Sequence, residues 1–434
     1  MIYTKSLNYK YETDVFVAGG GPSGVAAAVA AARSGKKVFL AEATGCFGGL
    51  GTSGLVPAFA PFDDGENILA SGIGYEIRQR LDRSTPLRNW TTLDIEELKR
   101  EYDKIIVESG VDFSFFTSVY DVVVESGRVD SVILGSKSGL FAVKAKIYID
   151  CTGDGDLCAF GGAEYEIGDE CGVVMPQTLC SIWTDIDREK CNEPWNKYVE
   201  QAHRDGVLIN EDRHIPGFFH RKDGLSGGNI GHTFGINPID EKSLSSAMVE
   251  GRKSMLEFDN YFKTYFTGYE NMKLCTTASL LGVRESRRIV CDYMLNVNDF
   301  ISRAVFEDEI GRYCYPVDIH VMNTDKDEYE RFREEYQQKL RYKKGESYGI
   351  PYRSLIPVSF RNVLVAGRCI GTDRQMQASV RVMPGCFITG QAAGVAASLA
   401  CETEDVRKIS VKKLQENLIK LGAYIPITQT KNDK

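Results

Sequence analysis

A glycine-rich turn between a predicted strand and a predicted helix constrains the fold of this chain more than any other feature. The β-branched and apolar segment DVFVA (14–18) enters GGGPSG (19–24), and the alanine-rich segment VAAAVAAAR (25–33) follows at once. Strand, glycine turn and helix in this order are typical of a site for the pyrophosphate of a dinucleotide. A Rossmann-type unit is therefore predicted at the beginning of the chain.

Each position of the turn has a physical role in such a unit. Gly19 permits the tight turn, Gly21 lets the backbone approach a pyrophosphate, and Gly24 lets the helix lie close to the strand. Pro22 and Ser23 fall in the first helical turn, where free amides and the helix dipole attract phosphate. These five residues are predicted to hold the cofactor phosphates.

The second predicted strand, KVFLA (37–41), ends at Glu42, about twenty residues beyond the glycines. A carboxylate at this place accepts both hydroxyls of a ribose and disfavours a 2'-phosphate. The segment GLGTSG (49–54) also matches the glycine pattern, but no strand precedes it. We predict a loop there and not a second dinucleotide site.

Three further segments resemble FAD proteins of the glutathione-reductase-like superfamily. The stretch ATGCFGG (43–49) resembles the part that runs along the flavin side of the cofactor, which implies contacts from Ala43, Gly48 and Gly49. A β-meander is predicted over Phe113 to Val132, with a turn at Ser126-Gly127. The resemblance implies that the backbone of Val119 meets the adenine, and that Thr152 and Gly153 return the chain to the cofactor after the strand at 147–150.

Two segments near the C-terminus complete the pattern. NVLVAG (362–367) is a buried-type strand, and Met383-Pro384-Gly385 opens a helix of small residues that includes Gly390. The start of a helix aimed at the ring would stabilise the negative charge of a reduced flavin. The superfamily usually has Gly-Asp where this chain has Gly367-Arg368, so the partner of Arg368 stays open.

Taken together, the chain resembles the bacterial FAD-dependent oxidoreductase family, on the motifs GVRESRR (282–288), IPYRSLIP (350–357) and the run from Val363 to Gly394. The resemblance implies FAD and an interrupted FAD fold. The expected architecture is α/β, with a Rossmann-like FAD-binding domain (parallel sheet with β-meander) over 1–165 and 345–434. An α+β substrate domain is expected over 166–344, with helices near 241–267 and 325–343. We expect non-covalent FAD, since no histidine lies near the N-terminal glycines.

Composition excludes several classes of function. A net charge of -8 and a pI near 5.4 argue against nucleic acid and anionic membranes as partners. No apolar run of about eighteen residues and no signal-like N-terminus occur, so a cytoplasmic protein is expected. The twelve cysteines include no C-x-x-C pair, so reduced thiols and no metal site are predicted. Expected partners are a small-molecule substrate, an electron donor or acceptor of unknown identity and, as an option, a second copy of the chain.

Arginines are the first candidates for substrate binding. On a predicted helix, Arg284 shares a face with Arg287 and Arg288, which suits a clamp on a carboxylate or phosphate, with Glu285 nearby. A structural ion-pair cluster between domains explains the same residues. Arg381, and also Tyr352 and Arg353, flank the C-terminal flavin segments. Alternatively, Arg353 has only the structural role of holding the two domains together.

Histidines are the candidates for proton transfer. In YPVDIHV (315–321) the residues alternate, so Asp318 and His320 share one face of a predicted strand and form an acid and a base. An exposed strand face is the alternative. His232 lies in a predicted loop and is either catalytic or a solvated capping residue.

The pattern as a whole predicts an enzyme that transfers a hydride between a small anionic or polyhydroxylated substrate and flavin N5. The alternative is an FAD-binding electron-transfer subunit that needs a separate catalytic partner.

Overall fold

In the computed structural model, the predicted N-terminal unit forms the centre of a sheet. The structure describes residues 4, 6–210, 212, 215, 217–322, 330, 334 and 339–426. Strand β1 (Tyr9–Ala18) enters helix α1 (Pro22–Arg33) through the glycine turn. On one side β1 pairs in parallel with β2 (Val38–Ala41), and on the other with β8 (Gly139–Asp150).

Parallel strands extend this sheet in both directions. Strand β5 (Asp112–Ser114) pairs with β2, and β17 (Val363–Val365) pairs with β8. Both faces of such a sheet are covered, which is why β2 and β17 are short, continuous apolar runs that are buried throughout. The predicted α/β class with a parallel sheet is confirmed.

The β-meander is present, with boundaries that differ from the prediction. It consists of β6 (Ser118–Glu125), β7 (Arg128–Ser136) and β8, which pair antiparallel. The turn at Ser126-Gly127 is confirmed, and both residues have positive φ. Phe113 and Ser114 lie instead in β5, because their apolar neighbours pair with the buried strand β2.

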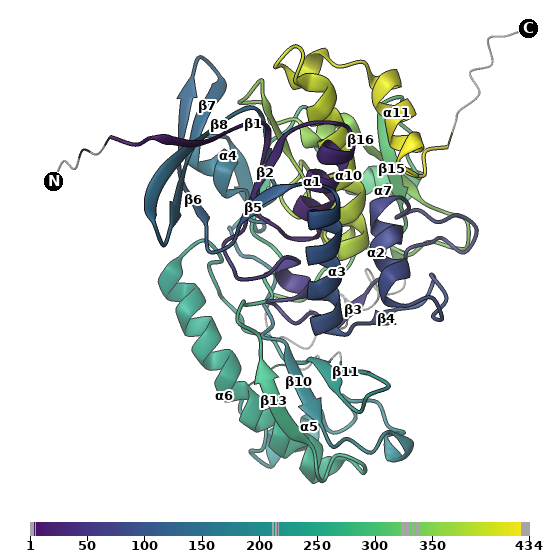
Figure 1. Ribbon diagram of the computed structural model, residues 1–434. Helices are drawn as coiled ribbons and strands as arrows, with labels where there is room; N and C mark the ends of the chain where they lie inside the picture. Colours follow the sequence, from purple (N-terminus) through teal and green to yellow (C-terminus); the bar gives the residue numbers. More distant parts are fainter. Residues whose placement is uncertain are drawn as a thin grey trace, which may run out of the picture.

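Helices cover the sheet, and two of them pack unusually closely. Helix α10 (Met383–Ala400) lies against α1 (Figure 1), and a Cβ atom on Gly390 would lie 2.1 Å from the carbonyl oxygen of Ser23. Small residues on both helices permit this distance. The other helices of this lobe are α2 (Ile73–Leu81), α3 (Ile95–Glu108), α4 (Asp156–Phe160), α7 (Val297–Ser302), α9 (Arg374–Val380) and α11 (Val411–Lys420).

A second lobe projects from this body (Figure 1). It contains an antiparallel sheet in the order β11-β12-β10-β13 and has its own hydrophobic core, which includes Trp183, Phe218 and Phe262. The predicted helix at 241–267 is confirmed as α6, whereas the one at 325–343 falls largely outside the described residues. The domain boundaries at 165 and 345 stay predictions. The elements of this lobe are β10 (Ser181–Thr184), α5 (Val199–Arg204), β11 (Gly217–His220), β12 (Ser226–Asn229), α6 (Glu241–Tyr265) and β13 (Lys273–Thr277).

Short elements connect the two lobes. Strand β9 (Tyr165–Ile167) pairs with β14 (Arg287–Ile289), and β15 (Glu309–Tyr313) pairs with β16 (Tyr348–Pro351). The helix predicted for GVRESRR is therefore wrong, because this segment is extended and its end forms β14. The remaining elements are β3 (Ala58–Phe59), β4 (Thr91–Thr92) and the 3-10 turns η1 (Gly49–Gly51), η2 (Arg188–Lys190), η4 (Tyr352–Leu355) and η5 (Val406–Lys408).

Among the described residues, no single helix is long and apolar enough to cross a membrane. Helices α9 and α10 reach that length and composition only as a pair, with a bend of 93° between them.

Candidate active site

A cavity of about 640 Å³ contains residues of both lobes in its wall. Its upper wall comes from the glycine turn, the end of β2, the end of β8 and the start of α10. Its lower wall comes from the segment just before β10, from β12 and α6, and from the segment before β14. The predicted cofactor residues that line it are Gly19, Gly21, Pro22, Ser23, Glu42, Ala43, Gly49, Val119, Thr152, Gly153, Arg368 and Met383.

The glycine turn has the shape of a phosphate cradle. Gly19 has a φ of +92°, and a Cβ atom there would lie 2.5 Å from the carbonyl oxygen of Cys151. A Cβ on Gly21 would meet nothing within 4 Å, because this residue faces the open cavity. Gly21 is also the N-cap of α1, and no side chain caps that helix. The first amides of α1 are thus directed at space that a phosphate can fill.

Four predicted cofactor residues lie outside the cavity wall and act in packing. A Cβ on Gly24 would lie 1.8 Å from the carbonyl oxygen of Gly19, and one on Gly367 would lie 2.6 Å from the Ser23 hydroxyl. Gly390 packs on the backbone of Ser23, and Gly48 donates from its backbone to the carbonyl oxygen of Gly20. These residues bring α1, β17 and α10 together and thereby shape the cavity.

Glu42 closes the end of the cavity beside β2. Its carboxylate is buried and accepts hydrogen bonds from the backbone of Gly20 at 2.7 Å and from the backbone and hydroxyl of Thr44 at 2.7 Å. A carboxylate has about four lone-pair sites, so capacity for ribose hydroxyls remains. These hydrogen bonds hold the side chain in place, which sequence alone did not indicate.

The start of α10 forms the opposite end of this upper wall. Its N-cap Val382 and its first residue Met383 line the cavity, and no side chain caps the helix. Arg368, for which the sequence left the partner open, forms an ion pair of 2.8 Å with Asp154 and donates at 2.8 Å to the Ser286 hydroxyl. The uncapped starts of α1 and α10, the open space beside Gly21 and the carboxylate of Glu42 all lie along one cavity. This arrangement fits FAD.

Two partly buried arginines, Arg284 and Arg381, face the lower part of the cavity. Arg284 donates to the carbonyl oxygen of Pro176 at 3.1 Å and to the hydroxyl of Thr178 at 2.7 Å. No carboxylate among the described residues forms an ion pair with it. Burial first, and then the like charge of Arg381, lowers the pKa of Arg284 to about 10. Arg284 therefore lacks a direct carboxylate partner among the described residues.

In the GVRESRR motif, Arg284 lies at the cavity, whereas the charged residues after it form ion pairs within the protein. Successive side chains of an extended segment point to opposite sides, so Arg284 faces the cavity while Glu285 points away from it. Glu285 is fully buried and binds Arg288 at 2.9 Å and Arg374 at 3.0 Å. Arg287 pairs with Asp156 at 2.8 Å. Arg287 and Arg288 thus belong to the structural ion-pair cluster that was one of the two alternatives, and the clamp stays a prediction for Arg284, which lines the cavity.

A line of acids and histidines reaches the cavity from the second lobe. Asp318 and His320 both line the cavity, but the strand predicted for them is not assigned in the structure. His232 does not line it. Its Nε2 atom lies 3.1 Å from Nδ1 of His320, and its Nδ1 atom lies 2.9 Å from Oδ2 of Asp212. Asp212 carried no sequence signal, because only the fold brings it to His232.

Burial and the neighbouring charges shift the pKa values of Asp318 and His320. Burial raises the pKa of Asp318, but His320, Arg381 and Arg284 together hold it well below its usual range. Burial and Arg284 lower the pKa of His320 well below 6.5, in part offset by Asp318. Near neutral pH, Asp318 is thus a carboxylate and His320 is neutral.

Tyr352 and Arg353 lie outside the cavity wall. The Tyr352 hydroxyl donates to the carbonyl oxygen of Val406 at 2.8 Å, and Arg353 pairs with Asp308 at 3.0 Å. Asp156, which the sequence analysis passed over, does line the cavity. Burial and then Asp154 raise its pKa to about 6.

Comparison with known proteins gives a broad match. A family model described as FAD dependent oxidoreductase matches residues 14–418. Thiamine thiazole synthases from Methanococcus aeolicus and Pyrococcus horikoshii are 28% and 29% identical over 188 and 168 residues. These matches cover 40% and 35% of this chain and 66% and 62% of the relatives, which is less than two thirds of either.

A solved structure, that of a flavoprotein/dehydrogenase from Cytophaga hutchinsonii, aligns over 94% of this chain and 83% of its own. Its sequence identity is 13% and its TM-score is 0.47.

Proposed function

We propose that this chain, which belongs to the family of FAD-dependent oxidoreductases, is an enzyme that uses FAD to oxidise or reduce a small organic anion in the cavity. When bound, FAD supplies two-electron chemistry, in which a hydride passes between a substrate carbon and flavin N5. A separate electron donor or acceptor restores the cofactor.

The cofactor lies along the upper wall in this proposal. The amides at the start of α1 bind the phosphates, and Glu42 accepts the ribose hydroxyls. The start of α10 at Met383 faces the flavin ring. This order leaves the lower part of the cavity, which is lined by Arg284, Arg381 and His320, for the substrate.

The unpaired charge of Arg284 is the observation that carries the assignment of an anion. A buried cation without a carboxylate partner is costly, and an entering carboxylate would restore the balance of charge. Arg381 adds a second cation, which is only partly offset by Asp318 at 3.6 Å. A guanidinium pair that binds a carboxylate also orients the substrate against the ring.

Part of the lower wall is apolar and can contact a short hydrocarbon body on that anion. Leu244, Met248, Leu281 and Val283 line the cavity beside Arg284. The polar side chains of Asn229, Ser245 and Ser279 line the same cavity, so the preference for a carboxylate rests on the two cations, Arg284 and Arg381. A small carboxylate is therefore favoured over a polyhydroxylated substrate.

An FAD-binding subunit that delivers electrons to another protein is the competing function. An interior cavity with cations and a histidine beside the cofactor position favours the enzyme, since electron transfer needs none of these side chains.

Anaerobic mixing of the FAD-loaded protein with a panel of small molecules tests the proposal. The panel contains 2-hydroxy acids, dicarboxylates, and neutral polyols of similar size. We expect loss of the visible flavin absorbance with one or more carboxylates and none with the polyols. Bleaching by polyols alone, or by no member of the panel, would contradict the assignment of an anionic substrate.

A further inference from the structure

We propose that Arg368 binds the diphosphate of FAD with the side of its guanidinium that faces the cavity, while Asp154 and Ser286 hold the other side in place. Arg368 is thus a direct ligand of the cofactor, and Asp154 and Ser286 are positioning residues. Only the identity of the cofactor is taken from the proposed function, and nothing is assumed about the substrate.

One side of the Arg368 guanidinium is fixed by a closed group of three side chains. Its Nη1 atom lies 2.8 Å from Oδ1 of Asp154 and donates at 2.8 Å to the hydroxyl of Ser286. The Ser286 hydroxyl in turn donates at 2.6 Å to the same Oδ1 atom. Both contacts of the guanidinium within this group therefore use Nη1.

The other side of the guanidinium remains available. Within the part of the chain that the structure describes, Nη2 and Nε of Arg368 make no hydrogen bond and no ion pair. Neither nitrogen is fully enclosed by protein, and the side chain, which is 11% exposed, lines the cavity. These two nitrogens carry the parallel N–H groups with which an arginine binds two oxygens of one phosphate.

The backbone beside Arg368 lies against the helix start that forms the phosphate cradle. A Cβ atom on Gly367 would lie 2.6 Å from the hydroxyl oxygen of Ser23. Ser23 is the second residue of α1 and lines the cavity together with Gly21. Arg368 therefore extends from a point that adjoins the free amides of α1.

The guanidinium itself lies close to the turn that borders the cradle on its other side. A Cβ atom on Gly153 would lie 2.8 Å from Nη2 of Arg368, and a Cβ atom on Gly19 would lie 2.9 Å from Cα of Thr152. The turn at Thr152-Gly153 thus packs on Gly19 and leaves room for the arginine. Gly19, Thr152 and Gly153 line the cavity as well. Both the backbone and the charged end of Arg368 therefore adjoin the predicted position of the phosphates.

The charges at this place suit a phosphate ligand. A diphosphate carries negative charge on both phosphates, and the partial charge of one helix start offsets only part of it. In the absence of a ligand, Asp154 stabilises the mostly buried cation of Arg368. Because this ion pair uses Nη1, a phosphate can bind at Nη2 and Nε without breaking it.

The GVRESRR motif contributes to this arrangement through the residues that follow Arg284. Ser286 is fully buried, and Arg287 donates at 3.0 Å to the backbone carbonyl oxygen of Asp154. The extended segment that carries Arg284 to the lower part of the cavity therefore also holds Asp154, and with it Arg368, in the upper part.

Competition between FAD and its fragments tests the contact on the full chain. ADP contains the adenosine and both phosphates of FAD but no flavin and no ribityl chain, and adenosine contains no phosphate. The FAD-loaded protein is dialysed to equilibrium against rising concentrations of ADP or adenosine. The FAD released, together with the affinity for FAD measured separately, gives the dissociation constant of each competitor.

Arg368→Met removes the guanidinium. We expect the affinity for ADP to fall by about tenfold or more, and the affinity for adenosine to stay close to that of the wild type. Arg361→Met is the matched control, because Arg361 is exposed, precedes β17 and does not line the cavity. Equal affinities of these two variants for ADP would overturn the proposal.

Arg368→Lys separates a direct contact from the effect of charge, since Arg368→Met also leaves Asp154 unpaired near the phosphates. A lysine keeps the positive charge beside Asp154 but lacks a second side with parallel donors. We expect normal folding and an affinity for ADP that falls several-fold. An affinity equal to that of the wild type would overturn the proposal, and this variant decides the question if Arg368→Met does not fold.

Ser286→Ala tests the positioning role. If Ser286 acts through Arg368, the alanine should weaken binding of ADP in the otherwise wild-type chain and have no further effect in Arg368→Met. A serine that only stabilises the fold would give the same change in both backgrounds, and for adenosine as much as for ADP. That result would refute the positioning role.

The outcomes separate this inference from the proposed function. The expected losses of ADP affinity, together with no bleaching by any carboxylate, would refute the proposed substrate and leave Arg368 as a ligand of the diphosphate. A loss of affinity for FAD without a loss for ADP would overturn the inference, because Arg368 would then contact the flavin or its ribityl chain. Bleaching by a carboxylate in the wild type would leave the proposed function standing in that case.

Discussion

The guanidinium of Arg381 donates a hydrogen bond of 3.1 Å to the backbone carbonyl oxygen of Arg284. This bond joins the C-cap of α9, two residues before α10 begins, to the extended segment that carries the second arginine. It holds two cations side by side at one cavity wall. The cofactor lobe thereby determines where the substrate charge is bound.

Replacement of Arg284 tests the anion site. In Arg284→Met the carboxylate loses a charged hydrogen-bond partner worth about 1.5–3 kcal/mol, so its binding should weaken by about tenfold or more. FAD should remain bound. Calorimetric titration with the carboxylate that bleaches the wild type measures the change. The exposed Arg252→Met on α6 is the matched control and should bind as the wild type does.

Two glycines of the same turn should respond in opposite ways to alanine. In Gly24→Ala the new methyl group overlaps the carbonyl oxygen of Gly19, and the free energy of unfolding should fall by about 3 kcal/mol or more. In Gly21→Ala the backbone conformation suits alanine and the space is open, so folding should be normal while FAD is lost. Urea unfolding and flavin absorbance measure the two effects. Retention of FAD by Gly21→Ala would argue against this cradle.

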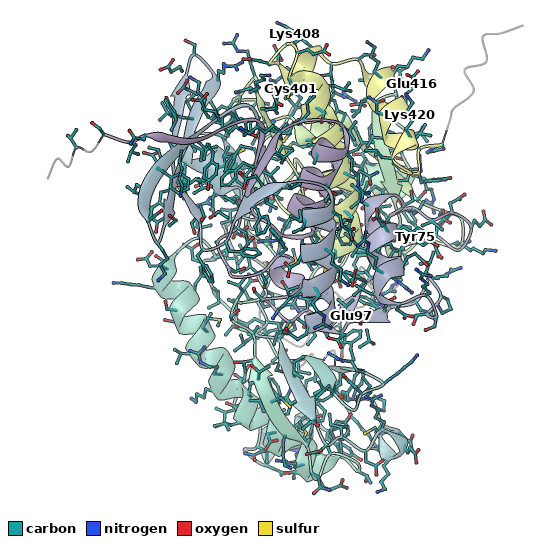
Figure 2. The ribbon with its side chains drawn as sticks, viewed as in Figure 1. Tyr75, Glu97, Cys401, Lys408, Glu416 and Lys420 are labelled. Carbon is teal, nitrogen blue, oxygen red and sulfur yellow. The ribbon has the colours of Figure 1, made fainter. Side chains whose placement is uncertain are left out.

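Glu42→Gln tests the ribose contact while preserving the shape of the side chain. Loss of the charge weakens the hydrogen bonds to the ribose and to Gly20, and FAD affinity should fall by about tenfold or more. Equilibrium dialysis against FAD gives the ratio. Glu416→Gln is a suitable control, since Figure 2 shows Glu416 at the outer end of the upper lobe, far from the second lobe. Equal affinities of the two variants would exclude the contact.

His320 should make stability depend on pH. Its pKa in the folded state is well below 6.5, so below pH 6.5 the unfolded chain binds a proton that the folded chain does not. Stability should therefore fall as the pH falls below 6.5, by up to about 1.4 kcal/mol per pH unit, and His320→Gln should remove this contribution.

Asp156 acts in the opposite sense over part of this range. Its pKa of about 6 in the folded state exceeds the usual 3.8, so between these values the folded chain retains a proton that the unfolded chain releases. The difference between His320→Gln and the wild type at each pH isolates His320. His203→Gln is the control, and a difference that does not vary with pH would contradict the assignment.

The purified protein should be yellow and should release FAD on denaturation, because the family binds FAD and the glycine turn provides the cradle. Chromatography of the released cofactor identifies it. A colourless protein that binds only NAD on titration would be incompatible with this expectation.

The main elements of the cofactor lobe could be predicted from the sequence because they depend on residues that are close together in the chain. The glycine turn, the acid after the second strand and the small-residue helix each depend on neighbours within about twenty residues. Backbone sterics and helix starts need those residue types at those spacings, whatever surrounds them. Gly19, Gly21 and Glu42 were thus singled out one by one from the sequence, and the structure places all three along one cavity.

Only the tertiary structure decided which polar residues meet. The segment GVRESRR suggested a helix, but pairing of Arg287 with Ile167 in β9 holds it extended, and of its charged side chains only that of Arg284 lines the cavity. Asp212, His232 and His320 come from separate loops, and no local pattern records their 2.9 Å and 3.1 Å contacts. Hydrogen bonds and charges act over a few ångströms in space, so the groups that contact His320 are determined by the packing of the chain and not by the order of residues along it.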